Sequence, residues 1–201
     1  MTEISFTEAI RMEDGKLHNL NYHQKRFDAT LRRFWHNEHN DISLQSALSH
    51  IMPKDGIYKI HIEYNGEGIS EITQSEYKIR DIRSLRLVNA DDAEYSYKYA
   101  DRLALMKLQQ SRQDSDEVII VRNGCLTDTS YSNIALHNDS GWFTPDKPLL
   151  PGTMRRSLID KGLLSAIDIK PEHLHNYDTI CLINAMMPLG RLVLPVSAIK
   201  I

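Results

Sequence analysis

Asn123 and Gly124 constrain the fold of this sequence more than any other feature. They stand between two largely apolar runs, EVIIVR at 117–122 and CLTD at 125–128. Asn-Gly between apolar strands is the strongest short-range signal for a β-hairpin with a two-residue turn. We therefore expect two antiparallel strands joined at these residues, in a domain built on a sheet.

A two-residue turn also predicts the register of the hairpin. It pairs Arg122 with Cys125 and places Asp128 opposite Ile119. Asp128 then lies on a rigid sheet beside apolar neighbours. A carboxylate in such a place needs a cationic or hydrogen-bonding partner, so Asp128 is a candidate functional residue as well as a possible turn residue.

The rest of the chain alternates strand and helix patterns, which predicts an α+β protein. The polar stretch around Arg80 and Asp81 predicts a boundary between a small α+β domain at 1–81 and a larger α+β domain at 82–201. No internal repeat is visible. The predicted strands are 3–13, 16–20, 57–64, 69–79, 84–89, 117–122, 125–128, 133–137, 142–145, 179–184 and 191–196; the predicted helices are 22–36, 42–52, one after Lys98 and one after Pro151.

Composition excludes several classes of protein. Of 201 residues, 41% are hydrophobic, which is ample for packed cores. The net charge is −3 with acids and bases interspersed, so we expect neither nucleic-acid nor membrane partners. The first fifteen residues lack the basic and apolar regions of a signal peptide, and no apolar run approaches a membrane span. We therefore expect a cytoplasmic protein.

Histidines raise the question of a metal site. His36 and His39 lie three residues apart in WHNEHN, but no Cys or carboxylate set completes a ligand shell there. We therefore expect no metal ion.

Lys98 lies among tyrosines in YSYKYADRLALMKL (95–108), just ahead of a predicted amphipathic helix. Tyr99, Leu103 and Met106 recur at a spacing that keeps one face toward a core. A cation near a helix N-terminus is electrostatically unfavourable unless weakening its charge has a use. Lys98 is therefore either a surface cation or a reactive amine.

Four further positions each give only weak evidence for a functional site when taken alone. Thr153 opens a predicted helix after Gly152 and could cap it, and backbone N–H groups there form an anion site. Arg26 could be a surface cation, and the Asn184-Ala185 pair could cap a turn. Together with Lys98 and Asp128, these residues supply what pyridoxal phosphate (PLP) requires: an amine for its aldehyde, a carboxylate for its ring nitrogen, and donors for its phosphate.

With these residues in view, the sequence resembles the class IV aminotransferases, the fold-type IV PLP enzymes that include 4-amino-4-deoxychorismate lyase. The resemblance covers most of the chain. The matching runs are FTEAIRMEDGKL (6–17), YHQKRF (22–27), KYADRL (98–103), LTDTSYSNIAL (126–136), LLPGTMRR (149–156) and INAMMP (183–188).

The resemblance implies a role for each candidate residue. Lys98 would be the catalytic lysine that forms a Schiff base with the cofactor. The other residues would bind the cofactor: Arg26, Thr153 and Met154 at its phosphate, Asp128 at its pyridine nitrogen, Asn133 behind the ring, and Asn184 with Ala185 at the end of the site. It also implies a two-domain fold like that of D-amino-acid aminotransferase, with the cofactor in the interdomain cleft, a small-molecule amino substrate, and a homodimer.

The K-x-x-[DN]-R-L pattern from Lys98 and the ending Asn184-Ala185-Met-Met-Pro are most similar to the lyase branch, which would eliminate pyruvate to give p-aminobenzoate. A branched-chain or D-amino-acid aminotransferase is the alternative, and a diverged non-catalytic cofactor-binding member is a further one. Three departures bear on this choice. Asp128 stands where the family usually has glutamate, and residues 62–72 (IEYNGEGISEI) lack the arginines of the lyase loop R-G-x-G-x-R-G-Y. The sequence also starts almost at 6–17, without the family's usual preceding strand.

Overall fold

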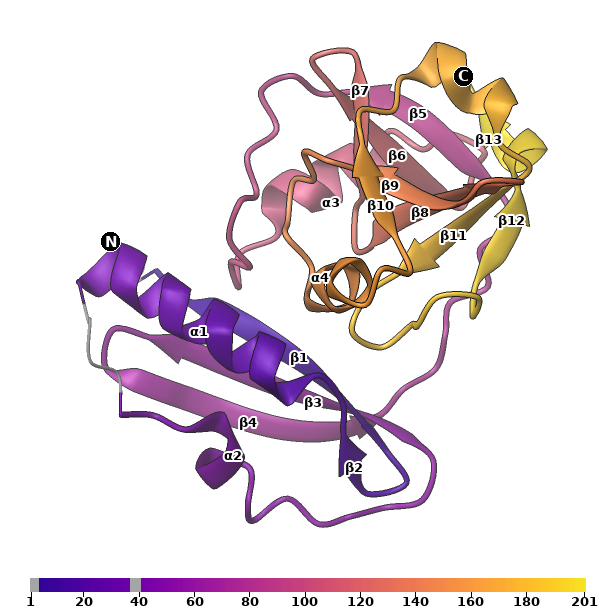
Figure 1. The fold of residues 1–201 in the computed structure, drawn as a ribbon. Coiled ribbons are helices and arrows are strands. Elements are labelled where there is room, and N and C mark those ends of the chain that lie inside the picture. The colour runs from indigo at the N-terminus through magenta and orange to yellow at the C-terminus, as the bar shows by residue number, and fades with distance from the viewer. Residues whose placement is uncertain (1–3, 37–40) are drawn as a thin grey trace. The chain divides into compact units, whose positions relative to one another are not determined.

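A computed structural model describes residues 4–36 and 41–201 of the chain. These residues form two compact units (Figure 1). The N-terminal unit contains the described residues up to Lys78 together with Tyr97–Asp101, and the C-terminal unit contains Ile79–Ser96 and Arg102–Ile201. The expected mixture of helices and strands in an α+β fold is confirmed.

An antiparallel sheet forms the N-terminal unit, with the strand order β2-β1-β3-β4 among the described residues. The predicted hairpin at Asp14-Gly15 is confirmed, because Met12 pairs with Leu17 and Glu13 with Lys16. The strands are β1 (Phe6–Glu13), β2 (Lys16–Leu17), β3 (Ile57–Asn65) and β4 (Gly68–Glu76), and the helices are α1 (Leu20–Trp35) and α2 (Leu44–Ala47).

Helix α1 covers one face of this sheet (Figure 1). Alternation along β1 and β3 directs Ile10 and Ile60 toward that face, where Phe27 and Leu31 of α1 pack against them. The helix predicted at 22–36 is confirmed. The helix predicted at 42–52 is shorter, because the chain continues after α2 in tight turns such as the one closed by the Ile51 N–H and the Leu48 carbonyl.

Residues Tyr97–Asp101 join the N-terminal unit, although the sequence boundary placed Lys98 in the larger domain. The Thr7 N–H donates to the Lys98 carbonyl at 2.8 Å, and Phe6 forms an antiparallel bridge with Tyr99. The Tyr97 and Tyr99 rings also contact the Phe6 ring. These contacts join segments more than ninety positions apart, which local sequence patterns do not reveal.

Helix α3 (Leu103–Gln110) corrects the prediction made around Lys98. Leu103 is 61% and Met106 54% exposed, and Leu105 is instead the buried residue of the helix. The predicted apolar face of Tyr99, Leu103 and Met106 is therefore wrong. Because the helix begins at Leu103, Lys98 lies outside the first turn, where the helix dipole acts. The dipole argument for a weakened charge on Lys98 therefore fails.

The C-terminal unit is built on a mixed sheet, which contains nine strands within the described residues. Seven of them follow the order β10-β9-β8-β7-β6-β5-β13, and β11 pairs with both β8 and β12. The strands are β5 (Leu85–Asn89), β6 (Glu117–Arg122), β7 (Cys125–Thr129), β8 (Asn133–Asn138), β9 (Gly141–Pro145), β10 (Ser165–Ile167), β11 (Thr179–Ile183), β12 (Val193–Pro195) and β13 (Ile199–Lys200).

The hairpin between β6 and β7 confirms half of the predicted register. Asn123 and Gly124 have φ angles of 50° and 73°, the left-handed values that a tight hairpin turn requires. Arg122 pairs with Cys125 as predicted, but Ile119 pairs with Thr129 and not with Asp128. The register shifts between Ile119 and Val121, and an irregularity of this kind is not visible in a two-residue turn signal.

Helix α4 (Thr153–Asp160) packs against this sheet, as predicted from the run after Pro151. Its Met154 and Leu158 side chains meet Ala135, Cys181 and Ile183 in a buried cluster. Two short 3₁₀ helices, Pro171–Asn176 and Val196–Ala198, complete the unit.

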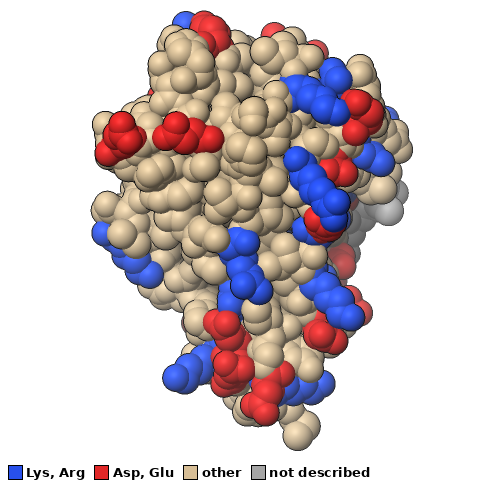
Figure 2. Space-filling model, turned by 90° about the vertical axis from the view of Figure 1, so that its right-hand side faces the viewer, with Lys and Arg blue, Asp and Glu red and all other residues tan. Residues whose placement is uncertain are grey.

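Surface charge agrees with the composition. Figure 2 shows acidic and basic side chains interspersed on the face drawn, without a broad area of one sign. Among the described residues, no helix has the length and apolar character needed to cross a membrane.

Candidate active site

The backbone around Lys98 contacts the N-terminal sheet. Its carbonyl accepts from the Thr7 N–H, and the next residue, Tyr99, forms the bridge with Phe6. The backbone of Lys98 is therefore held beside the beginning of β1. Truncating its side chain would leave these backbone contacts intact.

A buried ion-pair network lies beneath the same region of the N-terminal unit. Glu8 on β1 is fully buried and receives two hydrogen bonds from Arg26 on α1, Nε to Oε1 at 2.8 Å and Nη2 to Oε2 at 2.6 Å. The His23 Nδ1 lies 2.5 Å from Oε2 of the same carboxylate. His23 and Arg26 are three residues apart and therefore share one side of α1.

Two of the three side chains in this network are charged, and His23 is not. Burial alone would raise the pKa of Glu8, but the Arg26 charge and the hydrogen bonds from Arg26 and His23 lower it to about 2. Burial lowers the pKa of His23 against the opposing effect of Glu8. Glu8 is therefore ionised and His23 neutral at neutral pH, and the bidentate contact sets the plane of the Arg26 guanidinium.

The network makes a testable prediction about acid stability. Because the folded-state pKa of Glu8 is about 2 against 4.5 for an ordinary glutamate, its ionisation favours the folded state above pH 4.5, and this stabilisation is lost as the pH falls toward 2. We expect Glu8 alone to account for about 3 kcal/mol of unfolding free energy in that window. Urea unfolding at about pH 5 and about pH 3 would measure roughly half of this loss, because the folded-state carboxylate is still mostly ionised at pH 3.

Glu8→Gln should lose less stability than the wild type between these two pH values. Glu76→Gln, which changes an exposed glutamate of β4, should behave like the wild type. Equal losses in the wild type and Glu8→Gln would contradict the lowered pKa.

In the C-terminal unit, Asp128 has the partners that its position on a sheet predicted. Its Oδ1 accepts from the Asn133 side-chain amide at 2.8 Å, and its Oδ2 accepts from the Leu150 N–H at 2.8 Å. Asp128 on β7 and Asn133 on β8 also face each other in the strand pairing. Asn133 further donates to the Leu150 carbonyl, so this amide links the carboxylate to the loop before α4.

Burial raises the pKa of Asp128 to about 6, because its hydrogen bonds from Leu150 and Asn133 and the charge of Arg155 offset only part of the desolvation. The carboxyl group is therefore mostly ionised at pH 7. A cationic partner at this position would favour the ionised form further.

The start of α4 lies against the same amide. A Cβ added at Gly152 would lie 2.0 Å from Oδ1 of Asn133, so any side chain there would displace it. Gly152 is the N-cap, and Thr153 is the first helical residue rather than the cap, which corrects the predicted capping role. The Met154 side chain packs into the core, so only its backbone could contact an anion at the helix start.

Asn184 and Ala185 lie in the turn after β11. Oδ1 of Asn184 accepts from the N–H groups of Met186 at 2.9 Å and Met187 at 3.0 Å, and its amide donates to the Tyr131 carbonyl. Asn184 therefore caps this turn, which was one of its two interpretations from the sequence; the other was a contact with the cofactor.

The predicted residues fall into two groups, one in each unit. Lys98 and Arg26 lie in the N-terminal unit, where the Lys98 charge acts on His23. Asp128, Asn133 and the start of α4 lie together in the C-terminal unit. Sequence reasoning missed Glu8 and His23, although both lie in the runs FTEAIRMEDGKL and YHQKRF that carried the resemblance. His39, which was considered above as a possible metal ligand, lies outside the described residues.

Comparison with known proteins identifies the family. The model of the amino-transferase class IV family matches residues 5–199, so the chain belongs to this family. An uncharacterized protein of Haemophilus influenzae is 36% identical over 181 residues, covering 89% of this chain and 96% of the relative. The chain is therefore an enzyme, and its cofactor is pyridoxal 5'-phosphate.

Solved structures agree with this fold. A candidate 4-amino-4-deoxychorismate lyase from Haemophilus somnus 129pt is 31% identical with a TM-score of 0.87, over 94% of this chain and 100% of that chain. The PLP-bound form of a hypothetical aminotransferase from Mycobacterium tuberculosis is 19% identical with a TM-score of 0.70, over 98% and 81% of the two chains. The branched-chain amino acid aminotransferase of Escherichia coli is 15% identical with a TM-score of 0.72, over 98% and 77%. At these lower identities the likeness shows the fold alone.

The residues present fit PLP chemically. An amine and a guanidinium occur in the N-terminal unit, and a buried carboxylate occurs in the C-terminal unit. Asp128 is buried and mostly ionised at pH 7, as a partner for a protonated pyridine nitrogen must be. Gly152 keeps the start of α4 clear of a side chain beside Asn133, so backbone N–H groups there can approach a phosphate.

Proposed function

We propose that this enzyme acts on a small amino-group substrate, with Lys98 as the catalytic residue and Asp128 as the residue that sets the reactivity of the cofactor. The observation that carries the proposal is the Asp128 carboxylate, buried and held by two N–H donors. When bound, PLP supplies an electron sink that stabilises negative charge on the substrate's α-carbon.

Each residue of the proposed site has one task. Lys98 would hold the cofactor covalently through Nζ and, once a substrate amine has replaced it, carry protons on that nitrogen. Asp128 would accept a hydrogen bond from the pyridine nitrogen, and Asn133 would keep the carboxylate in place. Arg26 would bind the phosphate, with its guanidinium oriented by Glu8. The backbone of Thr153 and Met154 would add N–H groups to the same phosphate, and Asn184 with Ala185 would complete the cofactor contacts.

We favour a reaction like that of 4-amino-4-deoxychorismate lyase, in which pyruvate is eliminated and p-aminobenzoate is released. The lyase-like runs and the likeness to the Haemophilus somnus protein support this choice. The β3-β4 hairpin favours the alternative, a class IV aminotransferase, because residues 62–72 carry no arginine to bind a substrate carboxylate. We further expect a homodimer, which analytical ultracentrifugation would test.

The deciding experiment uses protein reconstituted with PLP. We expect 4-amino-4-deoxychorismate to give equal amounts of pyruvate and p-aminobenzoate. A panel of amino acids with 2-oxo acids, run in parallel, should give little transfer. Transfer without pyruvate release from the chorismate compound would overturn the lyase and support the aminotransferase.

Arg26→Lys tests whether Arg26 binds the phosphate of the cofactor, and it keeps a positive charge beside Glu8. Lysine keeps the charge but cannot make the bidentate contact of a guanidinium. We expect the dissociation constant of PLP, measured by fluorescence titration, to rise about tenfold, the loss of one charge-assisted hydrogen bond. Arg32→Lys, on the exposed side of α1, is the control and should bind like the wild type. Unchanged affinity in Arg26→Lys would count against the placement.

A further inference from the structure

The face of the N-terminal sheet opposite α1 carries a cluster of potential ligands, two of which lie in the stretch 62–72 already noted for its lack of arginines. Alternation along β3 puts His61 and Glu63 on this face, because Ile60 and Ile62 on either side of His61 point into the core. Glu71 of β4 pairs directly with Glu63. The strand register shifts just beyond this pair, between Glu63 and Tyr64.

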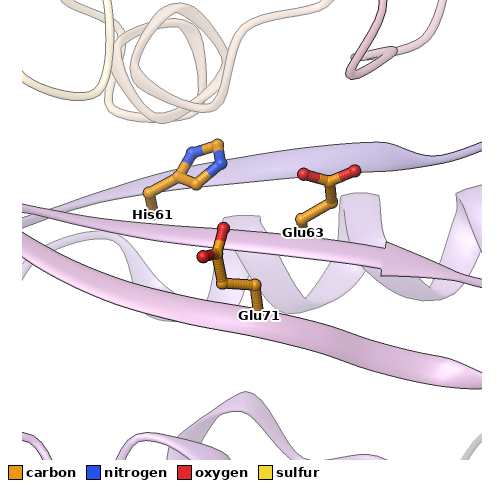
Figure 3. A group of neighbouring side chains, drawn as sticks. All are labelled: His61, Glu63 and Glu71. Carbon is orange, nitrogen blue, oxygen red and sulfur yellow. The ribbon is translucent and has the colours of Figure 1, made fainter.

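One nitrogen or oxygen from each of the three side chains lies within 4.8 Å of the other two. Figure 3 shows the three groups rising from one side of β3 and β4 toward a common region. Two neighbouring paired strands supply all three, so their backbone positions are fixed relative to each other. Small side-chain rotations would bring the donor atoms to a shared ion.

The two facing carboxylates of the cluster favour a cation. Glu63 and Glu71 are like charges directly opposite each other, an arrangement that destabilises an antiparallel pair. Among the described residues, no basic side chain forms an ion pair with either carboxylate. The Ser5 hydroxyl donates to Oε1 of Glu63 at 2.8 Å, and a hydrogen bond of this kind orients a metal-binding carboxylate.

The imidazole of His61 is available to a metal ion. Its side chain makes no hydrogen bond or ion pair within the part of the chain that the structure describes. The positive charges of Lys59 and Lys98 also act on His61, and the two carboxylates of the cluster oppose their effect.

We propose that His61, Glu63 and Glu71 bind a divalent transition-metal ion. One imidazole and two carboxylates are an oxygen- and nitrogen-rich set that suits Zn²⁺ or Mn²⁺, with water at the remaining positions. The set lacks the six to eight oxygen ligands of a calcium site. The site goes beyond the proposed PLP chemistry and does not depend on it.

Isothermal titration calorimetry of the cofactor-free chain, without an affinity tag, tests the proposal with ZnCl₂, MnCl₂ and CaCl₂. We expect saturable one-to-one binding of Zn²⁺ or Mn²⁺ and much weaker binding of Ca²⁺. His61→Ala and Glu63→Gln should each weaken binding by more than about tenfold, and Ser5→Ala by about tenfold. His50→Ala and Glu76→Gln change an exposed histidine and an exposed glutamate outside the cluster, and should bind like the wild type.

Glu71→Gln separates loss of the site from loss of the fold. It removes one of two facing like charges, so thermal unfolding without metal should occur at an unchanged or higher temperature while metal binding weakens. Absence of saturable binding to the wild type, or wild-type affinity in His61→Ala, would overturn the site. Because PLP is not present, failure here leaves the proposed function untouched, and failure of PLP binding leaves this site untouched.

Discussion

Lys98→Ala is expected to abolish covalent attachment of the cofactor and to lower turnover by about 10⁴-fold, the upper range for loss of a general acid-base group. The wild type reconstituted with PLP should show an absorption band near the visible edge. Reduction with borohydride should then fix the cofactor on the peptide that contains Lys98. The variant should show neither the band nor the modified peptide.

The fold should survive this change, because the backbone of Lys98 and the side chain of Tyr99 keep their contacts with β1. The Lys98 carbonyl accepts from Thr7, and Tyr99 packs on Phe6. Lys107→Ala is the matched control, since Lys107 is exposed on α3. Borohydride labelling of the Lys98 peptide in the wild type is the positive result; labelling at another lysine would refute the assignment of the reactive amine.

Elements with a local cause were predictable from the sequence. The turn at Asn123-Gly124, the hairpin at Asp14-Gly15 and helix α1 each follow from turn chemistry or from apolar spacing within about fifteen residues. The partners of Asp128 were predictable in kind, because a buried carboxylate requires hydrogen bonds. Their identity was not, since the Leu150 N–H comes from a loop 22 residues away.

Features set by tertiary contacts were not predictable. The register shift at Ile119 depends on how β6 and β7 accommodate an irregularity. The position of Lys98 depends on aromatic packing against β1, and the spacing of Leu103 and Met106 suggested a buried face that the structure does not have. Glu8 and His23 meet across 15 residues. Their pairing depends on the angle between α1 and β1, which periodicity does not specify.

Asp128→Asn is the second large effect that we expect. It should lower the turnover number by about 10²-fold to 10³-fold, the usual result of removing one preorganised electrostatic group from an active site. A neutral amide cannot keep a pyridine nitrogen protonated, so the electron sink would weaken. The dissociation constant of PLP should change much less, because Lys98 and Arg26 provide the covalent and charged contacts in this proposal.

The conservative change Asp128→Glu distinguishes charge from geometry. Glutamate keeps the carboxylate and is the residue usual in this family, although its extra methylene must fit beside Asn133 and the Leu150 N–H. Its turnover number should therefore fall far less than that of Asp128→Asn, which keeps the size of the side chain but removes the charge. Stopped-flow measurement of product formation, with PLP occupancy checked by absorbance, compares the two variants at equal loading. If Asp128→Asn turned over as fast as the wild type at full occupancy, Asp128 would have only a structural role between β7, Asn133 and the loop before α4.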